Sequence, residues 1–149
     1  MRVLGVDPGY SLGYALLEGD RLVEHGTLSP KGTTAERLSS LYKGVLELIN
    51  RLDAQVVALE KAFYGRSVPS LVKLAQVRGV VLAAAGTAGV EVVEVHPAEA
   101  KRGITGRGSA TKEQVVFMVK NIFNLDKITT HEADAISIAF FISKGGEHG

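Results

Sequence analysis

Three carboxylates stand at the ends of apolar segments, where a charge is costly to bury. Asp7 ends the run "RVLGVD", and Glu60 ends the run "QVVALE". Asp134 lies near the start of the apolar segment "HEADAISIAFFISK". A buried carboxylate needs a partner, and a divalent cation is a strong one. If the three converge, they have the chemistry of a two-metal phosphodiesterase, whose ions bind the attacking and leaving oxygens.

Each carboxylate alone also has a simpler explanation. Asp7 suits the turn that the following Pro-Gly pair predicts. Glu60 can pair with Lys61 or Arg66, and Asp134 near a helix amino terminus interacts favourably with the helix dipole. The metal-site hypothesis therefore depends on the three together, because three independent coincidences would otherwise have to place carboxylates at the ends of core elements.

The apolar patterns predict the elements that position these side chains. Continuous apolar runs and alternating segments predict strands at 2–7, 10–20, 21–29, 55–60 and 90–95, with a turn at 18–20. Apolar residues spaced three and four apart predict helices at 33–53, 70–89 and 111–124, a short one at 97–101 and a last one at 131–144, with a Gly-rich loop at 103–110. This order predicts an α/β fold, with a mixed five-stranded sheet flanked by helices on both faces.

Length and composition restrict the class of protein. A chain of 149 residues, 46% of them hydrophobic, is expected to form a single domain over 1–149. No uninterrupted apolar run reaches about 18 residues and no export signal begins the chain, so we expect a cytoplasmic protein that does not bind a membrane. The absence of cysteine excludes disulfides and thiolate metal sites. Oxygen ligands favour Mg²⁺ or Mn²⁺.

Local basicity is hidden by a net charge of only +1. Segments 61–90 and 100–112 each contain four basic residues and no acidic one: Lys61, Arg66, Lys73 and Arg78, then Lys101, Arg102, Arg107 and Lys112. Phe63 and Tyr64 follow Glu60 within the first segment. Basic stretches with interleaved aromatics are typical of nucleic-acid binding, although each charge alone could be a solvated surface residue.

Five segments resemble the RuvC family of bacterial Holliday-junction resolvases, in the family's order and over essentially the whole chain: "LGVDPGYSLGYAL", "VVALEKAFYGR", "LVKLAQVRGVVLAAA", "GRGSATKEQV" and "HEADAISIA". The resemblance implies a ribonuclease H-like fold. It further implies a homodimeric endonuclease that uses Mg²⁺, with two ions per subunit, and nicks two strands of like polarity across a four-way DNA junction. Cooperation with the branch-migration proteins RuvA and RuvB is also implied.

The resemblance assigns Asp7, Glu60 and Asp134 as the catalytic carboxylates and His131 to the fourth position, where many members have aspartate. Residues three apart share a helix face, so His131 and Asp134 can face one metal, whereas Glu132 is turned about 100° from His131. The spacing favours His131 as the ligand over Glu132. Whether His131 binds the metal, positions water or accepts a proton stays open.

The resemblance also assigns residues that hold the substrate. Lys101 and Lys112 match family lysines near the scissile phosphate, where a compact cation can stabilise the transition state. Phe63 matches the aromatic wedge at the junction centre, with burial against the following helix as the alternative. Tyr64 is a weaker candidate of the same kind.

Further basic side chains are candidates for phosphate contacts outside the catalytic centre: Arg66, Lys73, Arg78 and Arg107. For Arg107 a plain surface role is equally compatible with the sequence. Ala75, Gly79 and Ala83 form a small-residue helix face that would allow two such helices to approach, and the resemblance places the dimer contact there.

Other functions compete with junction cleavage. A related ribonuclease H-like nuclease acting on ribosomal RNA precursors has a similar set of carboxylates, but the Phe63 loop and the segment "GRGSATK" favour the junction enzyme. An ATPase of the actin and sugar-kinase type needs a second large domain. A non-catalytic junction-binding module would be expected to have lost a carboxylate, and all three are present.

Overall fold

A five-stranded mixed sheet forms the centre of the protein in the computed structural model, which describes residues 1–61 and 67–146. Its strands are β1 (Arg2–Asp7), β2 (Leu12–Glu18), β3 (Arg21–Leu28), β4 (Val56–Glu60) and β5 (Glu91–Val95). Their spatial order is β3-β2-β1-β4-β5. The β1–β2 and β2–β3 pairs are antiparallel, whereas β1–β4 and β4–β5 are parallel.

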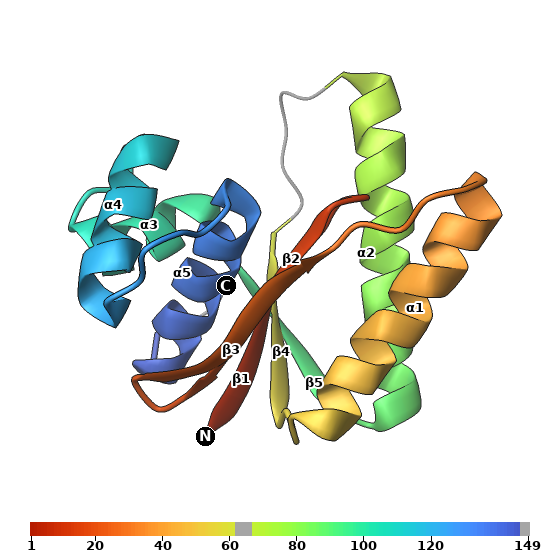
Figure 1. The fold of residues 1–149 in the computed structure, drawn as a ribbon, viewed down its shortest axis with the longest axis horizontal. Helices are drawn as coiled ribbons and strands as arrows, with labels where there is room; N and C mark the ends of the chain where they lie inside the picture. The colour runs from red at the N-terminus through yellow and green to blue at the C-terminus, as the bar shows by residue number, and fades with distance from the viewer. Residues whose placement is uncertain (62–66, 147–149) are drawn as a thin grey trace.

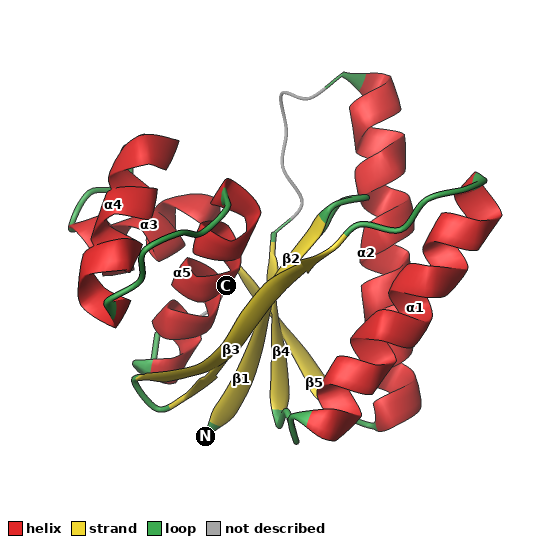
Figure 2. Ribbon diagram, viewed as in Figure 1, coloured by secondary structure: helices red, strands yellow, loops and turns green. Residues whose placement is uncertain are grey.

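Helices cover both faces of this sheet (Figures 1 and 2). One face carries α1 (Thr34–Arg51) and α2 (Val68–Ala88). The other carries α3 (Pro97–Thr105), α4 (Lys112–Phe123) and α5 (Thr130–Ser143). The predicted α/β class and the predicted mixed sheet with two helical layers are confirmed.

Side-chain alternation along β1 directs Asp7 toward α5. Val3 belongs to the core between the sheet and α3–α5, whereas Leu4 and Val6 belong to the core under α1 and α2. Successive side chains in a strand point to opposite faces, so Asp7 shares the face of Val3. The same alternation in β4, where Leu59 faces α1 and α2, places Glu60 on the α5 face.

Two glycines allow α5 to lie unusually close to the sheet. A Cβ added at Gly5 of β1 would collide with the backbone carbonyl of Ala135, and one at Gly13 of β2 would collide with the carbonyl group of His131. Only glycine permits such an approach of two backbones. The first half of α5 is therefore fixed over the carboxyl end of β1.

The apolar helix α2 is only partly covered by the rest of the described chain. Val77, Val81, Ala84 and Ala85 are buried on one side. By length and composition α2 could cross a membrane, although Lys73 and Arg78 interrupt its apolar sequence. Core helices of water-soluble proteins pass the same test, so this property alone assigns no membrane.

Two local expectations were wrong. The helix after β5 continues beyond residue 101 to Thr105, and Gly106 ends it with φ of 83°. The helix therefore includes residues 103–105, the first three positions of the predicted glycine-rich loop. Ile122 of α4 lies seven residues after Val115 and three after Val119, a spacing that predicts an inward-facing side chain, but it is 43% exposed. The apolar face of α4 that packs on α5 is therefore narrower than the sequence pattern predicts.

Candidate active site

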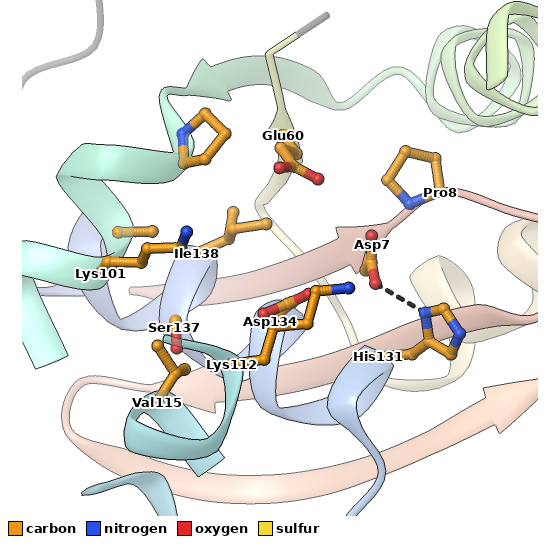
Figure 3. A pocket seen from close by; sticks show the side chains of 12 residues that line it. Asp7, Pro8, Glu60, Lys101, Lys112, Val115, His131, Asp134, Ser137 and Ile138 are labelled. Atoms are coloured by element: carbon orange, nitrogen blue, oxygen red, sulfur yellow. Dashed lines mark hydrogen bonds and ion pairs between the residues drawn. The ribbon is translucent and has the colours of Figure 1, made fainter. Parts of the chain in front are cut away.

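A pocket of about 300 Å³ lies where β1 and β4 end and α5 begins (Figure 3). Figure 3 shows the carboxylates of Asp7, Glu60 and Asp134 directed toward a common space. The lining includes all six residues predicted to be catalytic: Asp7, Glu60, Lys101, Lys112, His131 and Asp134. The structure thus brings together side chains separated by up to 127 positions in the sequence.

Sheet register explains why two of the carboxylates are neighbours. Val6 of β1 pairs with Leu59 of the parallel strand β4. Asp7 and Glu60 each follow that pair by one residue and share the α5 face. Carboxyl ends of parallel neighbours meet at one edge of a sheet, which is a frequent location for functional residues in α/β proteins.

His131 adds an imidazole to the carboxylates. Its Nδ1 lies 2.9 Å from Oδ2 of Asp7, a hydrogen-bond distance, while nearly half of the His131 side chain stays exposed. Asp134 lines the same pocket, as the three-residue spacing predicts. Glu132 instead turns to His25 of β3, so the geometric argument that separated His131 from Glu132 is confirmed.

Asp134 is a carboxylate of this pocket whose ionisation is strongly perturbed. Burial, and then the negative charge of Asp7, raise the pKa of Asp134 to about 6, while Lys112, His131 and Lys101 oppose this rise. The two lysines therefore only partly compensate the negative charge that the pocket collects. A buried carboxylate with this property is a marker of a functional site, and a bound metal cation would offset the remaining repulsion from Asp7.

The chemistry of these donors fits a divalent metal ion, although the residues are not already arranged as a metal cage. Carboxylate oxygens are the preferred ligands of Mg²⁺, and an imidazole is acceptable to Mn²⁺. Within residues 1–61 and 67–146, no three His, Asp or Glu side chains are grouped closely enough to enclose an ion. Small adjustments of these side chains would therefore have to accompany metal binding.

The first turn of α5 is anchored to the edge strand β3. Nδ1 of His25 donates to Oε1 of Glu132 at 2.5 Å, and the hydroxyls of Thr27 and Thr129 are 3.5 Å apart. Thr129 and Glu132 also form the capping box of α5. Burial opposes the ionisation of Glu132, but hydrogen bonds from His25 and Thr129 outweigh it and hold the pKa of Glu132 below its ordinary value.

Removing His25 should therefore loosen this anchor. We expect His25→Ala to lower the free energy of unfolding by about 1–3 kcal/mol, because the buried Glu132 carboxylate loses a donor. His25→Asn should retain most of the stability, since its Nδ2 occupies nearly the position of the histidine Nδ1. Urea unfolding of both variants at neutral pH tests this, and equal stabilities of the alanine and asparagine variants would contradict it.

The residues predicted to bind DNA fall into three groups. Lys73 of α2 and Arg107, which follows α3, are exposed. Phe63, Tyr64 and Arg66 lie outside the residues that the structure describes, so their roles stay predictions. Arg78 is mostly buried and binds the protein itself, donating to the backbone carbonyl of Glu60 and to Glu94. Its predicted phosphate contact is therefore not supported by its position.

Sequence reasoning missed parts of the pocket and its supports. Ser137 lines the pocket one turn after Asp134, and its hydroxyl donates to the carbonyl of Ala133 at 2.8 Å. The three-residue spacing from Asp134 was the available signal. No sequence pattern indicated the contact between His25 and Glu132, because it joins residues 107 positions apart.

The mixed sheet and the carboxylate pocket at the ends of β1 and β4 define a ribonuclease H-like nuclease. Residues 3–141 match the family described as crossover junction endodeoxyribonuclease RuvC. The chain belongs to the RuvC family. Nucleases of this family cleave DNA and depend on divalent metal ions.

Individual relatives agree with this assignment. The RuvC protein of Chlorobium phaeovibrioides is 39% identical, in an alignment that covers 93% of this chain and 79% of the relative. That of Caldanaerobacter subterraneus is 36% identical, covering 93% and 90%. The structure of Thermus thermophilus RuvC, solved in complex with Holliday junction substrate, is similar with a TM-score of 0.84 and 34% identity, covering 97% of this chain and 96% of that one. The alternative function on ribosomal RNA precursors gains no support from these comparisons.

Proposed function

We propose that this protein resolves Holliday junctions in DNA recombination and repair by hydrolysing phosphodiester bonds symmetrically. The observation that carries this proposal is the convergence of Asp7, Glu60 and Asp134 on one pocket that also contains Lys101 and Lys112. Family membership identifies the substrate class, since a related protein was solved with Holliday junction substrate. We further propose that residues 1–149 form one domain and act in the cytoplasm.

Asp7, Glu60, His131 and Asp134 are the residues that would hold the metal ions. We assign them two Mg²⁺ ions per subunit, with Mn²⁺ able to substitute, because oxygen donors predominate. The ions would stabilise the attacking and leaving oxygens of the cleaved phosphodiester. The raised pKa of Asp134 supports this assignment, because a bound cation relieves the repulsion between its carboxylate and that of Asp7.

The remaining side chains of the pocket act on the phosphate and on each other. Lys101 and Lys112 approach from α3 and α4 and neutralise charge on the scissile phosphate. The hydrogen bond from His131 orients the Asp7 carboxylate. That contact is compatible with three roles for His131: metal ligand, positioner of water or proton acceptor. In each role His131 acts beside Asp7.

Contacts outside the pocket would hold the junction arms. We propose that Lys73 and Arg107 contact phosphates, which fixes the register of the DNA without reading its sequence. Arg66 is proposed for the same role, and Phe63, with Tyr64 beside it, is proposed to insert at the junction centre, where an aromatic ring can stack on unpaired bases. Cooperation with RuvA and RuvB is proposed from the family resemblance alone.

We propose that α2 forms the contact of a homodimer. A four-way junction has two-fold symmetry, so symmetric cleavage needs two active sites. One face of α2 exposes Val68, Val72 and Leu82, with Ala75 and Gly79 between them and Ala83 directly after Leu82. In the described part of the chain, nothing outside the helix backbone lies within 4 Å of a Cβ placed at Gly79. Small residues permit close packing of a second copy on this apolar face.

Leu82→Glu should convert the dimer to a monomer, because a buried unpaired charge at the contact is unfavourable. Leu82 is 46% exposed, so the substitution should leave the folded subunit intact. Sedimentation velocity of the wild type and the variant measures the change. A wild type that is monomeric at all concentrations, or a variant that stays dimeric, would contradict the proposed contact.

The experiment that tests the proposed function compares substrates. Purified protein is incubated with Mg²⁺ and a synthetic four-way DNA junction, a linear duplex of matched sequence or a structured RNA. We expect cleavage of the junction and intact linear DNA and RNA. Preferential cleavage of the RNA would favour the alternative function and overturn the proposal.

A further inference from the structure

We propose that Arg78 is a positioning residue for the catalytic strand end of β4, linking Glu60 to helix α2. The juxtaposition that supports this is a guanidinium placed between the backbone carbonyl of Glu60 and the carboxylate of Glu94. The inference depends on the proposed nuclease function, in which Glu60 is a metal ligand. It assigns Arg78 a task within the protein in place of a phosphate contact.

Arg78 contacts two acceptors, one on β4 and one on β5. Nη1 donates to the carbonyl oxygen of Glu60, and Nη2 donates to Oε2 of Glu94 at 2.7 Å. Only 14% of the Arg78 side chain is exposed. Arg78 follows the buried residue Val77 in α2, so its backbone is fixed by the packing of that helix. A planar guanidinium on a fixed backbone can hold two acceptors in one geometry.

The strand neighbours of β4 explain why Glu60 needs this donor. In a parallel ladder, a carbonyl accepts from the residue that follows its partner on the neighbouring strand. On the β1 side that residue is Pro8, which has no N–H. On the β5 side the N–H of Lys61 donates to the carbonyl of Val95, and because the Glu60 carbonyl belongs to the same trans peptide it points away from β5. Arg78 donates to this carbonyl where β4 ends.

The contact from Arg78 can orient the Glu60 side chain because Glu60 is the last residue of β4. The carbonyl of Glu60 and its side chain belong to the same residue, so fixing the peptide plane restricts the direction of the carboxylate. Catalytic groups must be held within about 0.5 Å of the productive geometry. Glu94 neutralises the guanidinium and holds it against β5, which leaves Arg78 poorly placed to attract DNA.

Positioning and phosphate binding predict different kinetic effects. Loss of a positioning residue lowers the cleavage rate at saturating junction and leaves affinity unchanged. Loss of a phosphate contact weakens binding. It also reduces the slope of the logarithm of the binding constant against the logarithm of salt concentration by about one. Arg78→Gln and Lys73→Gln form a matched pair of variants, because each removes one positive charge from α2.

The experiment measures three quantities for wild type, R78Q, R78K, E94Q and K73Q. These are the single-turnover cleavage rate at saturating four-way junction, the Kd in chelator at several salt concentrations, and the Tm. For R78Q we expect a 10- to 100-fold lower rate with a Kd within twofold of wild type. R78K and E94Q each keep part of the contact and should lose less. K73Q should weaken binding and lower its salt dependence.

Other outcomes overturn the inference. An R78Q protein with a normal saturating rate and weaker binding would make Arg78 a phosphate contact, and one with both quantities normal would make it a bystander. If R78Q fails to fold, wild-type rates in both folded R78K and folded E94Q would also overturn it. A wild type that cuts no four-way junction would instead overturn the proposed function, so the two failures are distinguishable.

Discussion

Replacing Asp7 with asparagine is expected to abolish junction cleavage while the junction still binds. The substitution keeps the size of the side chain and an amide oxygen that can accept from His131, but it removes the negative charge that a metal ion needs. Metal ions contribute several kcal/mol to charge stabilisation in the transition state, so the single-turnover rate should fall by about 10³-fold or more. The exposed basic residues stay unchanged, so the Kd for the junction should change less than twofold.

The matched control for this prediction is Asp20→Asn. Asp20 lies in the exposed turn between β2 and β3, and its substitution removes the same charge at a position away from the pocket. Its cleavage rate should equal that of the wild type. If Asp7→Asn cleaves as fast as Asp20→Asn, Asp7 is only a turn residue and the metal assignment is wrong.

Replacing Asp134 with asparagine should stabilise the metal-free protein while it destroys activity. Burial and the charge of Asp7 raise the pKa of Asp134 from 3.8 to about 6, so the folded state prefers the protonated carboxyl. The wild type therefore loses stability as the pH rises through about 6. At pH 8 the cost is at most about 3 kcal/mol, since each pKa unit corresponds to about 1.4 kcal/mol. Asparagine is neutral at every pH and avoids this cost.

Urea unfolding in chelator between pH 4 and pH 8 measures the effect. The advantage of Asp134→Asn should be largest at pH 8 and should shrink as the pH falls below 6, where the wild-type carboxyl becomes protonated. Metal binding to the wild type should weaken over the same range, because protons compete for the ligand. An asparagine variant less stable than wild type at pH 8 would show that the Asp134 charge is well compensated without a metal.

The sequence predicts the candidate catalytic carboxylates because their positions depend on simple local rules. Asp7 and Glu60 each end a continuous apolar run, which is typical of a strand buried in the centre of a sheet, and the structure makes the two strands neighbours. Side-chain alternation then directs both toward the same face. His131 and Asp134 are three apart on one helix, so their common face also follows from local geometry.

The supporting contacts could not be predicted because they depend on the three-dimensional arrangement. In the sequence Arg78 is one of the cations of a basic segment. Only the packing of α2 against β4 and β5 shows that its guanidinium donates to Glu60 and Glu94. The contact between His25 and Glu132 likewise requires the register of β3 and the height of α5 above the sheet. The glycine at 103 suggested a loop, whereas packing of α3 on α5 carries the helix through it.

The central claim is that this pocket is a metal-dependent centre that cuts Holliday junctions. Its most direct test is strand-resolved cleavage of a four-way junction whose strands carry distinct labels, with Mg²⁺ titrated from zero. We predict that cleavage is absent in chelator, rises with Mg²⁺ and places paired nicks symmetrically in two strands of like polarity. Cleavage that persists in chelator, or nicks scattered over the strands without symmetry, would contradict the claim.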